Sequence, residues 1–94
     1  MATFFMFGRY SADALKDMSA KRTEESVELI KKFGGEVKSM HAMLGEYDLI
    51  FQVDFPDFKT AMKVSVVLNK LTGIRFVTSQ TMGVEEFDNL VAGI

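Results

Sequence analysis

The chain has 94 residues, a formal net charge of -2 and a hydrophobic content of 48%, which is enough for one domain over residues 1–94 with one modest core. Its acidic balance argues against a nucleic-acid partner, because phosphate-backbone binding requires a basic stripe. With no cysteine and a single histidine, disulfides, thiolate zinc sites and histidine-rich metal clusters are excluded, so we expect a cytoplasmic protein with no metal and no cofactor.

Residues 3–9 form a short apolar run rich in phenylalanine, which predicts a central strand. The run has no basic leader and no small-residue cleavage site, so we interpret it as a strand and not as a signal peptide or a membrane span. Phe5 and Phe7 point to one side of this strand, and Phe4 and Met6 point to the other. Since both faces carry large apolar groups, we expect the second face to pack on another sheet, in a homodimer or higher homo-oligomer. The alternative is a monomer with one solvated sheet face.

A long helix is predicted over residues 12–33. Ser11 offers an N-cap, and the pair Gly34-Gly35 ends the helix because glycine adopts the left-handed conformation without steric cost. Arg22 falls near the centre of the apolar stripe of this helix. Three arrangements of the Arg22 charge stay open: it extends past the sheet edge, it pairs with a carboxylate such as Glu25, or it binds an anionic ligand. The stretch 18–23 is also a candidate helix irregularity.

Residues 36–43 and 46–54 predict two strands of a hairpin joined at Leu44-Gly45. One face of this hairpin is apolar and should lie under the helices, with Leu49, Phe51 and Val53 beside Met40 and Ala42. The opposite face is mixed, and its expected members are Val37, Ser39, His41, Met43, Asp48, Ile50, Gln52 and Asp54.

The expected register sets residue 42 opposite residue 47, which brings His41 opposite Asp48 on the mixed face. A carboxylate there would orient the imidazole as a general base, and the alternative is an ordinary half-buried polar pair. Tyr47 points to the other face in this register. Its ring is expected to pack the core at the mouth of the sheet.

Pro56 suits the first turn of a second long helix over residues 56–71, and Gly73 ends that helix. A fourth strand over residues 74–82 and a short C-terminal helix over residues 84–91 follow. The order βαββαβ predicts an α+β, ferredoxin-like fold, in which an antiparallel four-stranded sheet of order 4-1-3-2 carries both long helices on one face.

The chain resembles the GYD domain family along nearly its whole length. The resemblance rests on Gly45-Glu46-Tyr47-Asp48, on Phe55-Pro56-Asp57, on Phe33-Gly34-Gly35 and on the run from Thr78 to Met82 before Glu85-Glu86-Phe87. It implies a ferredoxin-like fold and a dimeric α/β barrel, in which two such sheets pack face to face. The family has no generally assigned activity, and His41 stands where it usually has an aromatic residue.

Three functions are open at this point, and whether the protein is an enzyme is one of the open questions. The first is a homo-oligomeric, non-membrane module that binds a small molecule, with Arg22, His41, Tyr47 and Asp48 as the expected ligand-binding residues. The second is a cofactor-independent isomerase or monooxygenase-like enzyme that uses His41 and Asp48 as a catalytic pair. The third is a purely structural assembly domain.

Overall fold

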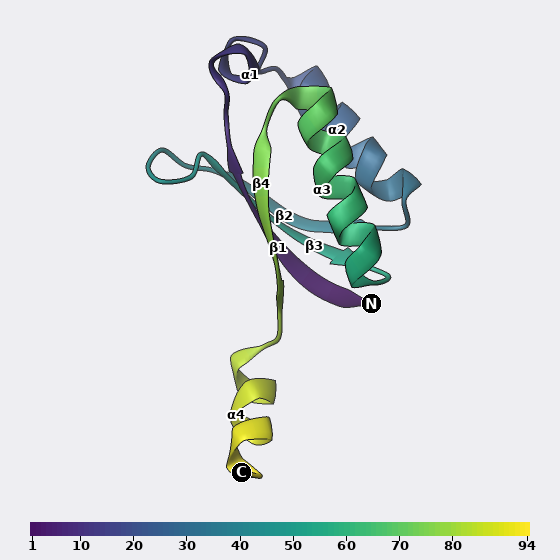
Figure 1. The fold of residues 1–94 in the computed structure, drawn as a ribbon, viewed down its shortest axis with the longest axis vertical. Coiled ribbons are helices and arrows are strands. Elements are labelled where there is room, and N and C mark those ends of the chain that lie inside the picture. Colours follow the sequence, from purple (N-terminus) through teal and green to yellow (C-terminus); the bar gives the residue numbers. More distant parts are fainter.

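One antiparallel sheet with two long helices on one of its faces makes up the body of the molecule (Figure 1). The computed structural model describes residues 1–94. Its elements are β1 (Ala2–Arg9), α1 (Ala12–Lys16), α2 (Ala20–Lys32), β2 (Glu36–Ala42), β3 (Leu49–Phe55), α3 (Phe58–Thr72), β4 (Arg75–Thr81) and α4 (Val84–Ala92). The sheet order is β2-β3-β1-β4, which is the expected order 4-1-3-2 read from the β4 edge. None of the helices has both the length and the apolar character needed to span a membrane.

The core lies between the sheet and the pair α2 and α3, because alternate residues of the strands are apolar. Its buried members are Phe4 and Met6 of β1, Phe51, Val53 and Phe55 of β3, Ile30 of α2, and Ala61, Val64 and Leu68 of α3. Met40 and Ala42 pair with Phe51 and Leu49, so the predicted helix-covered face of the hairpin is confirmed. The other side of the sheet, here called the open sheet face, has no helix over it. Its apolar residues are Phe5, Phe7, Ile50 and Val77.

The first predicted helix is wrong as a single element, because the chain breaks it into α1 and α2. Ser11 caps α1, as expected, by accepting a hydrogen bond from the Ala14 N–H at 3.0 Å. A second cap then starts α2: Ser19 has extended backbone (φ -163°, ψ 162°), and its hydroxyl accepts from the Arg22 N–H at 3.1 Å. A serine that satisfies a free helix N–H favours a new helix start over continuation. The helix end is confirmed, with Gly34 at φ +84°.

The predicted register of the hairpin is also wrong. His41 lies opposite Ile50, and Asp48 lies beyond the paired residues of β3. The Met43 N–H donates to the Asp48 carbonyl at 2.8 Å, which leaves residues 44–47 as a four-residue loop. The strand therefore starts three residues later than the sequence suggested, since Glu46 and Tyr47 belong to the turn. The shift is by two residues, so His41 stays on the open sheet face.

A β-bulge in β2 corrects one more assignment. The register shifts between Val37 and Ser39, so that Val37 pairs with Val53 and packs against the core instead of facing the mixed side. One extra residue reverses the face of every residue beyond it, because strand side chains alternate with a period of two.

The helix α3 starts two residues later than predicted, with Asp57 as its N-cap in place of Pro56 in its first turn. The Thr60 N–H donates to the Asp57 carboxylate at 2.7 Å. Gly73 at φ +76° ends the helix as expected.

The cap at Asp57 makes part of the stability depend on pH. Hydrogen bonds from the hydroxyl and the backbone N–H of Thr60 hold the pKa of Asp57 below its ordinary value of 3.8. Because the pKa is lower in the folded state, this contribution is complete above pH 3.8 and is lost as the pH falls through the folded value. Asparagine caps a helix about as well without titrating. We expect D57N to match the wild-type melting temperature near pH 7 and to lose less of it on acidification, as followed by circular dichroism. Parallel acid profiles would contradict this role.

Candidate functional site

A cleft of about 380 Å³ lies between α1, α2 and the adjoining ends of the strands. Most of its lining is apolar and comes from Ala14, Met18, Met40, Ala42, Leu49, Phe51 and Ile74. Two methionines adapt their shape easily, because the side chain is unbranched and the thioether is polarizable. A wider depression on the solvent side of α2 is lined mainly by lysine and glutamate and is a solvated helix surface. The first cleft has the volume and the lining of a small-molecule site.

The hydroxyl groups along the α2 wall of the cleft already have backbone partners. Ser26 donates to the Arg22 carbonyl at 3.0 Å, and Thr23 donates to the Ser19 carbonyl at 3.4 Å. By contrast, the hydroxyl of Tyr10, which lines the cleft, makes no hydrogen bond within the chain. His41 borders the cleft as well, but its strand register turns the side chain toward the open sheet face. The Tyr10 hydroxyl is therefore free to orient a ligand with a polar end.

Tyr10 is held in place by Asp48, which connects the predicted motif to the cleft. The Tyr10 N–H donates to the Asp48 carboxylate at 3.0 Å, and the Asp48 N–H donates to the Gly8 carbonyl at 2.8 Å. Partial burial raises the pKa of the Tyr10 phenol, and the negative charge of Asp48 raises that pKa further. The phenol consequently stays protonated at neutral pH and can donate a hydrogen bond.

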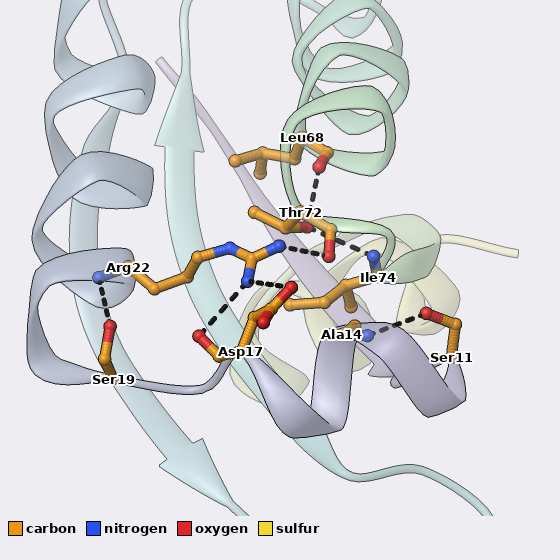
Figure 2. Close-up of polar contacts among 8 residues, drawn as sticks. All are labelled: Ser11, Ala14, Asp17, Ser19, Arg22, Leu68, Thr72 and Ile74. Atoms are coloured by element: carbon orange, nitrogen blue, oxygen red, sulfur yellow. Dashed lines mark hydrogen bonds and ion pairs between the residues drawn. The ribbon is translucent and has the colours of Figure 1, made fainter.

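The Arg22 side chain connects α2 to the ends of α1 and α3 (Figure 2), and this connection is here called the Arg22 bracket. Its guanidinium donates to the carbonyl of Asp17, at the end of α1, at 3.2 Å, and to the carbonyl of Thr72, at the end of α3. The Asp17 carboxylate lies 4.0 Å away, and no ion pair joins Arg22 to Glu25. Structural pairing is thus the arrangement observed, with Asp17 in place of Glu25. The Arg22 side chain is only 20% exposed, and it also lines the cleft.

The proposed catalytic pair is not formed. No hydrogen bond or ion pair connects His41 to Asp48, because the register sets His41 opposite Ile50 and the Asp48 carboxylate accepts from Tyr10 instead. His41 itself is exposed at the rim of the cleft. The enzyme hypothesis that depends on this pair lacks its geometry.

Tyr47 lies on the opposite side of the sheet from the predicted one. Its ring packs on Phe7 of the open sheet face with 5.3 Å between centroids, and the Arg9 guanidinium lies 5.4 Å from the Tyr47 centroid. Strand alternation does not apply to Tyr47, because it belongs to the loop. Of the four expected ligand-binding residues, Arg22 and His41 share the cleft, Asp48 reaches it through Tyr10, and Tyr47 is elsewhere.

Tyr10 is the cleft residue that the sequence reasoning missed. The signal was present: Phe4, Met6 and Gly8 alternate on the helix side of β1, and Tyr10 continues that series just past the strand end. Gly8 leaves space for the neighbouring side chains of Phe76 and Ile74, since a Cβ there would lie 2.9 Å from the Phe76 ring and 3.0 Å from Ile74. The structure has no group of three or more histidine, cysteine, aspartate or glutamate side chains placed to hold a metal ion.

The fold and the cleft define a class of small ferredoxin-like α+β domains with one helix-covered and one open sheet face. The GYD domain family matches residues 4–91, and the chain belongs to that family. No curated protein is similar enough in sequence to count as a match.

Two solved structures share the fold. One is the leucine response regulatory protein LrpA from Mycobacterium tuberculosis (10% identity, TM-score 0.58, 87% of this chain and 51% of that chain). The other is an AsnC family transcriptional regulator from Agrobacterium tumefaciens (20% identity, TM-score 0.58, 87% of this chain and 50% of that chain). The chain therefore spans about half the length of these proteins.

Proposed function

We propose that this protein is a cytoplasmic, homodimeric module that binds a small, mostly apolar ligand with one polar end. The observation that carries the proposal is the cleft of about 380 Å³, whose lining is mainly apolar and whose free polar group is the Tyr10 hydroxyl. Arg22 and Asp48 support the site from behind, because the first joins the helices that wall it and the second fixes Tyr10. A packed, structural assembly domain without a cavity is the poorer description.

The solved regulators share the fold with this chain. Because their sequence identity to it is low, they do not imply that this chain responds to leucine or regulates a gene. The support for a binding function over a catalytic one comes from the cleft of this chain and from the surroundings of His41. The cleft brings together hydrogen-bonding groups and apolar surface, and the one histidine has no carboxylate partner to make it a base.

The open sheet face supports the homodimer. Phe5, Phe7 and Ile50 are partly buried by their own chain, and Val77 is 52% exposed. A contiguous apolar sheet face of this kind favours packing against a second sheet, as in a dimeric α/β barrel. Native mass spectrometry of protein purified from its own host tests both parts together. We expect twice the chain mass of 10.6 kDa with added mass from a retained ligand, and a bare monomer would contradict the proposal.

A variant that fills the cleft tests the binding site directly. Ala42 lies on the helix side of the sheet at the mouth of the cleft, so A42F should occupy the volume that a ligand needs. With the apolar fluorophore 1-N-phenylnaphthylamine as the probe, we expect A42F to weaken binding by about tenfold or more, which is at least ~1.4 kcal/mol. The matched control is A20F, an exposed alanine on α2 outside the lining, which should bind as the wild type does. Equal binding by the two variants would place the probe elsewhere.

A further inference from the structure

The helix α4 has an apolar side that its own chain leaves uncovered. It extends from the end of β4, away from the sheet and the other helices (Figure 1), and none of its residues is buried. Val84, Phe87 and Leu90 are 75%, 52% and 58% exposed and recur every three residues, as one stripe of a helix requires. The remaining side is acidic, with Glu85, Glu86 and Asp88 and no basic residue.

A basic hollow lies at the other end of β4. Arg9 and Arg75 are direct cross-strand partners on the open sheet face, where like charges oppose each other unfavourably. Arg75 has no ion pair or hydrogen bond in the chain. The one ion pair of Arg9 is with the exposed Glu46 at 3.9 Å, and its guanidinium also lies against the Tyr47 ring. The two arginines border a hollow of about 250 Å³ that is walled by Tyr47, Phe76 and Val77.

We propose that this hollow receives α4 of a second copy of the chain. Glu85 and Glu86 of one copy then neutralise the arginine pair of the other, and Phe87 covers Tyr47 and Val77. The proposal rests on the sheet-to-sheet homodimer proposed above. A two-fold contact is reciprocal, so each dimer contains the arrangement twice.

The charges also select the symmetry axis. A two-fold axis that lies between the sheets and perpendicular to the strands places the two copies of β4 over each other and antiparallel. Thr81 of one copy, just before α4, then lies above Arg75 of the other. An axis along the strands would instead bring α4 to the start of β2. There Glu36 lies opposite Asp54, and Lys38 is already shared between their carboxylates at 3.2 Å and 3.8 Å. The acidic helix is attracted in the first arrangement and repelled in the second.

Charge reversal on each side of the contact provides the test. R9E/R75E and E85R/E86R each set like charges against each other in both contacts of their homodimer. We expect each variant alone to weaken self-association by about tenfold or more in sedimentation velocity. Mixing the two restores opposite charges in both contacts, so we expect a heterodimer as tight as the wild type. The control E24R/E28R changes the net charge as E85R/E86R does, on the solvent side of α2, and should dimerise normally.

Mixing separates a contact between chains from one within a chain, because only a contact between chains is rescued by a second protein. Variants that associate as the wild type does would overturn the docking of α4 and leave the sheet-to-sheet dimer standing. Weakened variants that fail to rescue each other would overturn it as well. A monomeric wild type would overturn both the docking and the dimer, whereas 1-N-phenylnaphthylamine binding would still report on the cleft. All the substituted side chains are exposed, and circular dichroism verifies that the variants fold.

Discussion

Replacing Arg22 by methionine should lower the free energy of unfolding by roughly 2–4 kcal/mol, because the Thr72 carbonyl loses a charged donor. Thr72 is 2% exposed, so water has little access to replace the bond. The same substitution frees the carbonyl of Asp17 and disconnects α1 from α3. Urea unfolding followed by circular dichroism measures the loss as a lower midpoint at unchanged slope.

Two companion variants show what the bracket requires. K21M removes the neighbouring charge at an exposed position of α2 and should change stability by no more than about 0.5 kcal/mol. R22K keeps the charge without the planar fork that reaches two carbonyls, so it should recover only part of the loss. If R22M were as stable as K21M, the bracket between helices would have no energetic role. We also expect R22M to loosen 1-N-phenylnaphthylamine binding, since Arg22 holds α1 and α2 around the cleft.

The sequence predicted the parts of this fold that depend on local periodicity. The strand order, the faces of Phe51 and Met40, and the glycines that end α2 and α3 all follow from alternation and from backbone sterics. The break at Ser19 was open in the sequence, because the same residues also suit a continuous helix. The break is set by the Ser19 cap together with the hydrogen bonds of Arg22 to the carbonyls of Asp17 and Thr72. Bonds of this kind depend on the tertiary structure, so they cannot be predicted from residue spacing.

The errors at the candidate site have one common origin. A hairpin register depends on loop length, and Gly45 fits a two-residue turn as readily as the four-residue loop observed. The choice of loop separates His41 from Asp48 and releases Tyr47 to the open sheet face. Tyr10 was not predicted as a cleft residue because it lies just past the end of β1. The alternation of side chains continues there although the strand has ended.

Gly35 should be the least replaceable loop glycine of the chain, although its backbone is ordinary. A Cβ there would lie 2.8 Å from Ile30 Cγ2 and 2.8 Å from Phe55 Cε1, and both of these side chains are fully buried. Neither neighbour can move into solvent, so G35A must shift the start of β2 away from the core. Overpacking of this kind costs about 1–3 kcal/mol.

Gly45 is the matched control, since it has no heavy atom within 4 Å of the Cβ position and no positive φ. G45A should leave stability unchanged or raise it by up to about 1 kcal/mol, because alanine restricts the unfolded chain. The predicted order of urea midpoints is therefore G45A, then wild type, then G35A. A G35A midpoint equal to that of G45A would mean that the close approach of β2 to Phe55 is not required. The glycine pair that ends α2 would then matter only through the left-handed backbone of Gly34 (φ +84°).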